Sequence, residues 1–284
     1  MPTAFVLSGG GSHAAVQVGM MQALSARGIR PDLVVGTSAG AVNAAFVGAY
    51  GVGSDALEDL AKLWRGMRRS TVFPLRADRG LLAVLGARES LCSPEPLARL
   101  LADVLPYTRL EHASIPVHAV ATDVLTGRGV LLSTGDPVSA LLASCAIPGV
   151  YPVVQRDGLA LCDGALADVS GVLQAVGLGA DRIYVLTAGA ACALGAVPRH
   201  PVSAALHALT LLLQQRVVAD ARAAGGAGRI RVVPPLCPLT VSASDFGHAT
   251  ELMRDARRTA ADWLDSESDD LLGAAEDPDA AIAG

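Results

Sequence analysis

The sequence predicts an α/β fold, because short apolar strands are followed by glycine-containing turns and then by helical segments. Residues 3–7 are apolar enough for a buried strand, and apolar positions recur at helical spacing from about Ala14 to Arg27. A second short apolar run, which contains the β-branched pair Val34 and Val35, leads through a Gly-rich turn into an alanine-rich helical stretch. Buried strands with alanine-rich helices packed over them account for this pattern.

Length and composition favour one large domain. The chain has 284 residues, of which 51% are hydrophobic, and this is ample for a sizeable core. No linker rich in proline, serine and glycine divides it. We therefore expect one domain over residues 1–265, followed by an acidic, disordered tail over residues 266–284.

The charge balance excludes some partners. The 22 basic and 27 acidic residues leave a net charge of −5, so we expect no nucleic-acid partner, and the surface lacks the basic density for electrostatic membrane anchoring. The long uncharged runs 1–26 and 33–54 are broken by glycine and polar residues, and the first lacks the basic start of a signal peptide. We therefore expect a cytoplasmic protein, with at most peripheral contact to a membrane.

The cysteines are odd in number, widely spaced and free of C-x-x-C pairs. This pattern predicts buried thiols in a reducing compartment at Cys92, Cys145, Cys162, Cys192 and Cys237.

The segment Gly36-Thr37-Ser38-Ala39-Gly40 has the form of a nucleophile elbow. A strand enters it and a helix leaves it, which is the context that a G-x-S-x-G motif requires. Gly36 and Gly40 let strand and helix pass closely on either side of a strained serine. Ser38 is then exposed at a helix N-terminus, where the partial positive charge stabilises an alkoxide or an oxyanion.

A second glycine-rich turn, residues 8–12, follows the first strand and precedes its helix. Consecutive backbone N–H groups can converge there on an anion or an oxyanion. The spacing of Gly9, Gly11 and Ala14 is also a loose dinucleotide fingerprint, with Asp32 near the distance expected for a ribose contact. Asp32, however, precedes its strand, whereas the ribose carboxylate should end one. No Gly-Lys-Ser/Thr follows, which excludes a P-loop. A tight turn with no binding role is a further possible interpretation of this segment.

Four motifs together resemble the patatin-like phospholipases. They are Gly9-Gly10-Gly11, the elbow around Ser38, Asp163-Gly164-Ala165, and the segment from Ala143 to Pro152 that reads ASCAIPGVYP. The resemblance covers most of the chain up to about Gly179. It implies a three-layer α/β/α sandwich with a mostly parallel central sheet, and hydrolysis of acyl esters of lipids.

The resemblance also assigns roles to residues. It implies Ser38 as nucleophile and Asp163 as general base, in a Ser-Asp dyad that needs no cofactor and no metal. The oxyanion hole would comprise Gly9, Gly10, Gly11 and Ala39, with Gly36, Gly40 and Gly164 in support. Two departures from the family pattern are His13 and Ala14, where a basic residue and a glycine are usual.

The remaining pattern extends the α/β interpretation along the chain. Residues 68–91 mix arginine with apolar residues and are consistent either with a mobile cap or with ordinary short core helices. We expect helices over 137–146 and 202–224 and in two apolar stripes within 50–106, and a final amphipathic helix after His248. We expect strands at 115–123, 129–133, 159–162, 182–188 and 229–233, and an apolar run at 150–154 that leads to a turn at 156–158.

Two rival functions stay open. One is an α/β-hydrolase with a Ser-Asp-His triad that uses His200, His207 or His248, although that fold normally places several strands before its elbow. The other is a catalytically impaired lipid-binding protein, which the departures at His13 and Ala14 favour. The six histidines show no metal-binding spacing, so we expect no zinc site.

Overall fold

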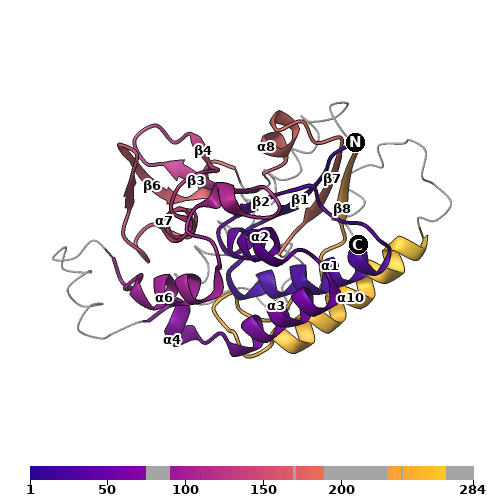
Figure 1. The fold of residues 1–284 in the computed structure, drawn as a ribbon. Coiled ribbons are helices and arrows are strands. Elements are labelled where there is room, and N and C mark those ends of the chain that lie inside the picture. The colour runs from indigo at the N-terminus through magenta and orange to yellow at the C-terminus, as the bar shows by residue number, and fades with distance from the viewer. Residues whose placement is uncertain (75–89, 169–170, 189–228, 238, 267–284) are drawn as a thin grey trace.

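A single mixed sheet forms the centre of the protein (Figure 1). The computed structural model describes residues 1–74, 90–168, 171–188, 229–237 and 239–266. Within them the strand order is β5-β6-β3-β2-β1-β7-β8, and β4 also pairs with β3. The strands are β1 (Thr3–Leu7), β2 (Leu33–Thr37), β3 (Val117–Asp123), β4 (Gly129–Leu132), β5 (Val154–Arg156), β6 (Leu159–Asp163), β7 (Arg182–Leu186) and β8 (Arg229–Val233).

The middle of the sheet is parallel and one end is antiparallel. Strands β3, β2, β1, β7 and β8 pair in parallel along their whole order, whereas β4 and β6 each pair antiparallel with β3, and β5 pairs antiparallel with β6. The carboxyl ends of parallel strands share one edge, so the turns that follow β1 and β2 lie side by side.

Helices cover both faces, as a three-layer sandwich requires. Figure 1 shows α8 on one side of the sheet and α1, α2, α3 and α10 on the other. The α-helices are α1 (Ala15–Ala26), α2 (Ala39–Tyr50), α3 (Ser54–Gly66), α4 (Arg69–Val72), α6 (Glu95–Val104), α7 (Pro137–Ser144), α8 (Val172–Gly177) and α10 (Ala249–Ser266), and the 3-10 turns are η1 (Gly11–Ala14), η2 (Leu110–His112) and η3 (Gly164–Leu166).

The two faces of β1 bury different cores. Phe5 and Leu7 belong to the larger cluster under α1, α2, α3 and α10, while Ala4 and Val6 belong to a smaller cluster with Val172 of α8. Successive side chains of a strand point to opposite faces, so a strand buried on both sides is apolar without interruption. This explains why residues 3–7 contain no alternating polar positions.

The C-terminal helix α10 packs directly on α1. A Cβ atom at Gly19 would lie 2.1 Å from the carbonyl oxygen of Met253, so only glycine permits this approach of the two backbones. The buried face of α10 contributes a stripe at helical spacing that includes Leu252, Met253, Ala256, Ala260 and Leu264.

The structure confirms the α/β prediction and most of the expected elements. Helix α8 was not anticipated, because its six residues show too little periodicity. The expected helix over 202–224, most of the segment 68–91 and nearly all of the tail 266–284 lie outside the described residues.

The prediction for the cysteines is wrong at one position. Cys92, Cys145 and Cys162 are buried thiols as expected, Cys192 lies outside the described residues, and Cys237 is exposed and disulfide-bonded. Widely spaced cysteines carry no signal for their pairing, which depends on Cα separations in the folded chain. The cysteine pattern therefore no longer supports a uniformly reduced protein. Among the described residues, no helix combines the length and apolarity needed to cross a membrane.

Candidate active site

Ser38 occupies a strained turn between β2 and α2. Its φ and ψ are 54° and −127°, an uncommon backbone conformation for a residue with a side chain. A Cβ at Gly36 would lie 2.5 Å from the Cα of Ala41, and one at Gly40 would lie 2.1 Å from the carbonyl oxygen of Leu7. Both glycines are thus required where the helix leaves the strand and crosses the end of β1.

Asp163 comes from the last position of β6 and meets Ser38 from the antiparallel side of the sheet. The Ser38 hydroxyl donates a hydrogen bond to Oδ2 of Asp163 over 2.7 Å, and the backbone N–H of Ala165 donates to Oδ1 over 2.9 Å. The structure therefore brings together two residues that are 125 positions apart in the chain.

Two contacts hold Asp163 against β3. The Thr122 hydroxyl donates to the carbonyl oxygen of Asp163 over 2.8 Å. The turn after Asp163 passes so close to β3 that a Cβ at Gly164 would lie 2.2 Å from the carbonyl oxygen of Val120. Gly164 therefore permits the close approach to β3 that positions the carboxylate.

The environment of Asp163 makes its carboxylate more basic. Burial raises the pKa of Asp163 to about 6, and the hydrogen bonds from Ser38 and Ala165 offset only part of this effect. Only 4% of Asp163 and 8% of Ser38 is exposed, so the pair is nearly excluded from water, and the expectation that Ser38 is exposed is wrong. A carboxylate with a pKa near 6 is ionised at neutral pH and is still basic enough to take a proton from a hydroxyl.

Helix α7 contributes a residue that sequence analysis missed. The Ser144 hydroxyl accepts a hydrogen bond from the backbone N–H of Ser38 over 2.9 Å and donates one to the carbonyl oxygen of Val120 over 2.6 Å. It thereby connects the elbow to β3, the strand that also holds Asp163. The motif containing Ser144 carried the family resemblance, but nothing in its local pattern indicated this bridge.

Cys145, the next residue, lies beside the dyad. Burial and the neighbouring Asp163 carboxylate raise the pKa of its thiol, although a hydrogen bond with Ser38 acts in the opposite direction. The thiolate is the nucleophilic form of cysteine. The raised pKa keeps Cys145 protonated at neutral pH, in its less nucleophilic form.

The glycine loop after β1 presents unused donors next to Ser38. A Cβ at Gly9 would lie 3.0 Å from the Cβ of Ser38, so the loop and the elbow are in contact. Among the described residues, no acceptor pairs with the backbone N–H of Gly9, Gly10, Gly11 or Ala39, and all four residues are only partly buried. Unpaired N–H groups at this point are what an oxyanion hole requires.

A buried polar network supports the base of this loop. Gln17 donates through Nε2 to the carbonyl oxygens of Ser8 and Leu186 over 2.8 and 3.0 Å. Asn43 donates to the Gln17 side chain over 2.8 Å and accepts a hydrogen bond of 2.7 Å from Nε1 of Trp64. The network joins the ends of β1 and β7 to α1, α2 and α3. Sequence analysis missed it, because a fully buried amide has no local signature.

His13, one of the departures from the family pattern, has a structural role. Its Nε2 lies 2.7 Å from the carbonyl oxygen of Val241, and burial lowers the pKa of the imidazole. Ser12 adds hydrogen bonds to the same segment, from its N–H to the Ala243 carbonyl and from its hydroxyl to the Ser242 carbonyl. A neutral histidine thus fastens the end of the glycine loop to residues 241–243.

The structure agrees with the sequence argument against a dinucleotide site at the first turn. The Asp32 carboxylate accepts a hydrogen bond of 2.7 Å from the N–H of Thr3, at the start of β1. The glycine loop follows the opposite end of the same strand, so Asp32 cannot contact a ligand held there.

The described histidines form no triad with Ser38 and Asp163. His248 instead pairs with Asp245 and Glu251 on the surface, and His200 and His207 lie outside the described residues. In the described part of the chain, no cluster of three His, Cys, Asp or Glu side chains is arranged to hold a metal ion.

Comparison with known proteins identifies the family. The model of the patatin-like phospholipase family matches residues 5–176. The chain belongs to this family. The matched range includes the glycine loop, Ser38 and Asp163, whereas residues 241–243, which anchor the patatin-like glycine loop, lie beyond it.

The relatives are mostly longer proteins. An uncharacterized NTE family protein of Mycobacterium bovis is 30% identical over 178 residues, which cover 63% of this chain and 46% of the relative. Lysophospholipase nte1 of Aspergillus oryzae is 27% identical over 198 residues, which cover 65% of this chain and 12% of the relative. The chain thus spans less than half the length of these relatives. The crystal structure of VipD from Legionella pneumophila aligns with 93% of this chain and 67% of its own, at 16% identity and a TM-score of 0.45.

Proposed function

We propose that this protein is a serine acyl hydrolase that cleaves acyl esters of lipids through the Ser38-Asp163 dyad. The observation that carries the proposal is the 2.7 Å hydrogen bond from a strained, buried serine hydroxyl to a carboxylate whose pKa is raised to about 6. Membership of the patatin-like phospholipase family and the resemblance to a lysophospholipase support a lipid ester as substrate.

In the first half of the reaction, Asp163 takes the proton of the Ser38 hydroxyl through Oδ2. The Ser38 Oγ attacks the ester carbonyl carbon, and the carbonyl oxygen becomes an oxyanion. The unpaired N–H groups of Gly9, Gly10, Gly11 and Ala39 are available to stabilise it. The C–O bond to the alcohol then breaks, and the alcohol leaves with the proton from Asp163.

In the second half, water replaces the alcohol. Asp163 takes a proton from the water, whose oxygen attacks the acyl-Ser38 carbonyl, and a second oxyanion forms at the same N–H groups. When this intermediate collapses, the fatty acid leaves and Ser38 regains its proton from Asp163. No cofactor or metal takes part in these steps.

The proposal is tested by hydrolysis of a panel of acyl esters of varied chain length and headgroup. We expect Ser38→Ala and Asp163→Asn to reduce turnover to a similar residual level, because each removes one half of the dyad. His248→Ala, which removes an exposed side chain, should retain most activity. A folded His248→Ala variant as inactive as Asp163→Asn would instead assign the protein to the triad class.

A further inference from the structure

A network of three buried side chains leads from α3 to the glycine loop. Its members are Trp64, Asn43 and Gln17, and none of them is more than 2% exposed. Asn43 lies in α2 and Gln17 in α1, and the other buried positions of both helices are apolar or glycine. Packing of the helices does not require a polar residue at either place, and burying one is costly unless it is hydrogen-bonded. Such a break in an apolar pattern is typical of a functional role.

The indole of Trp64 fixes the direction of every hydrogen bond in this network. Its Nε1 can only donate, so the Asn43 atom that lies 2.7 Å away must be the oxygen Oδ1. The Asn43 amide nitrogen then donates to the carbonyl oxygen of Ala14 over 2.9 Å and to Oε1 of Gln17 over 2.8 Å. Neither amide can rotate by 180° without bringing two donors or two acceptors into contact. Gln17 must therefore present its nitrogen Nε2 to the glycine loop.

The Gln17 amide holds the carbonyl oxygen of Ser8 inside the protein. Nε2 donates to this oxygen over 2.8 Å and to the carbonyl oxygen of Leu186, at the end of β7, over 3.0 Å. A peptide unit is planar and trans, so its N–H points in the opposite direction from its C=O. The N–H of Gly9 shares a peptide unit with the carbonyl of Ser8 and therefore points away from Gln17.

The next two peptide units of the loop are held in the same way. The Ser8 hydroxyl donates to the carbonyl oxygen of Gly9 over 3.4 Å, and the N–H of His13 donates to that of Gly10 over 3.2 Å. These two units carry the N–H groups of Gly10 and Gly11, which have no acceptor in the described part of the chain. Of the three peptide units, the first depends on a side chain from outside the loop, and this is where the network acts.

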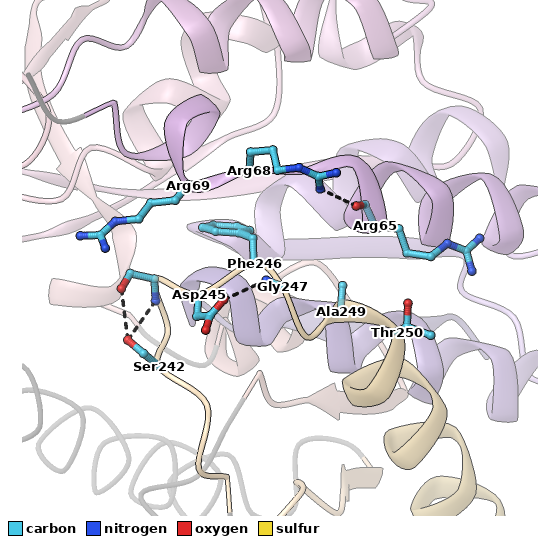
Figure 2. Close-up of a pocket in the computed structure, with 10 residues that line it drawn as sticks. Arg65, Arg68, Arg69, Ser242, Asp245, Phe246, Gly247, Ala249 and Thr250 are labelled. Carbon is cyan, nitrogen blue, oxygen red and sulfur yellow. Dashed lines mark hydrogen bonds between the residues drawn. The ribbon is translucent and has the colours of Figure 1, made fainter.

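The far end of the network is held by the segment that leads into α10. The ring of Trp64 stacks on that of Phe246, with the centroids 6.4 Å apart and the planes inclined by 10°. Figure 2 shows the Phe246 ring between this segment and the end of α3. Residues 241–243 of the same segment accept the hydrogen bonds of Ser12 and His13. The segment therefore supports the glycine loop directly at one end and through the network at the other.

We propose that Gln17 is a positioning residue for the oxyanion hole, which keeps the N–H groups of the glycine loop in their catalytic orientation before any substrate binds. Donors that are already oriented need no reorganisation when the oxyanion forms, and this is the source of their effect on the rate. The inference rests on the proposed acyl hydrolase for the identity of the reaction. The order of the loop, however, can be measured without turnover.

The kinetic test uses Gln17→Met, which keeps the length of the side chain and removes both donors. We expect kcat for an acyl ester to fall at least about 10-fold with little change in KM, a part of the loss of about 100- to 1000-fold that follows removal of an oxyanion donor. The inhibition constant of a long-chain alkyl trifluoromethyl ketone, whose adduct with Ser38 carries an oxyanion, should rise by the same factor, whereas that of the fatty acid product should not change. Gln17→His retains one ring donor and one ring acceptor and should recover part of the loss.

The structural test measures the order parameters of nitrogen-15 glycine amides by NMR. In folded Gln17→Met we expect the values for Gly9 and Gly10 to fall from about 0.85, typical of a rigid backbone, toward about 0.6. Ser25→Ala is the matched control, because it removes a hydrogen bond of 2.6 Å to the carbonyl oxygen of Val52 from the other end of the same helix. It should keep the kcat and the glycine order of the parent.

A folded Gln17→Met variant with the glycine order and the ketone affinity of the parent would overturn the positioning role. An equal loss in Ser25→Ala would overturn it too, because the effect would then reflect the stability of α1 alone. If Gln17→Met does not fold, Gln17→His is compared with Ser25→Ala by the same criteria. A parent that hydrolyses no ester, but whose Gly9 and Gly10 lose order in Gln17→Met, would contradict the proposed hydrolase and leave the positioning of the loop in place.

Discussion

Replacing Asp163 by asparagine should stabilise the protein while it removes activity. The carboxylate is buried, and its pKa is raised to about 6 in the folded protein, whereas an unfolded aspartate has a pKa near 3.9. The folded state therefore holds its proton more tightly. Between these two values stability falls as pH rises, because the folded protein must ionise a dry carboxyl group.

Relative to pH values below 3.9, where Asp163 is protonated in both states, this difference of about two pKa units lowers the free energy of unfolding by about 3 kcal/mol at pH 7 and by about 1 kcal/mol at pH 4.5. Asparagine is neutral at both pH values and nearly the same shape. Its oxygen can keep the hydrogen bond from the N–H of Ala165, and its amide can donate to the Ser38 hydroxyl, so no buried group loses its partner. We expect a gain of up to about 3 kcal/mol at pH 7 that shrinks to about 1 kcal/mol at pH 4.5.

Urea unfolding at both pH values measures the gain, with Asp123→Asn as the matched control. Asp123 is also buried, but its carboxylate accepts hydrogen bonds from the N–H of Leu125 and the hydroxyl of Thr126. The control should not be stabilised. A gain in Asp163→Asn that is absent, or that is the same at the two pH values, would refute the argument that Asp163 is a desolvated base.

Three further predictions concern the same site. Gly10→Val should lower kcat by about 100-fold or more with a smaller change in KM, because a Cβ at this position would lie 2.6 Å from the Cβ of Ala188 and displace the N–H donors of the loop. Steady-state kinetics measures both constants, and an effect on KM alone would assign the loop to substrate binding. Ser144→Ala should cost about 1–3 kcal/mol of stability, because it removes the acceptor of the buried Ser38 N–H and a hydrogen bond to the carbonyl of Val120. Urea unfolding tests this, and an unchanged midpoint would contradict it. Because Asp163 must be ionised to act as the base, kcat/KM should rise with pH to a plateau, with the midpoint of the rise near pH 6, the raised pKa of Asp163. A pH–rate profile that is flat between pH 5 and 7 would exclude Asp163 as the titrating group.

The sequence predicted the parts of the site that depend on local geometry. Gly36 and Gly40 flank Ser38 at a turn where strand, serine and helix are consecutive, and the close approaches at both glycines follow from that turn alone. The same is true of Asp163 and Gly164 at the end of a strand. Their proximity to Ser38 was carried by the family resemblance, because pairing across a sheet is not visible in local periodicity.

The parts that sequence analysis missed depend on long-range contacts. Ser144 contacts Ser38 from another helix. Gln17 and Asn43 hydrogen-bond to each other, but in the sequence each is only a single polar residue within an otherwise apolar helix. The disulfide at Cys237 also depends on which segments meet in space.

The most direct test of the Ser-Asp mechanism is labelling by an alkyl fluorophosphonate, followed by mass spectrometry of the intact protein and of its peptides. We expect one phosphonyl group on Ser38, no label in Ser38→Ala, labelling slowed by at least about 100-fold in Asp163→Asn, and an unchanged rate in His248→Ala. Label on another residue, or an Asp163→Asn variant that reacts as fast as the parent, would contradict the assignment of Ser38 as the nucleophile and Asp163 as its base.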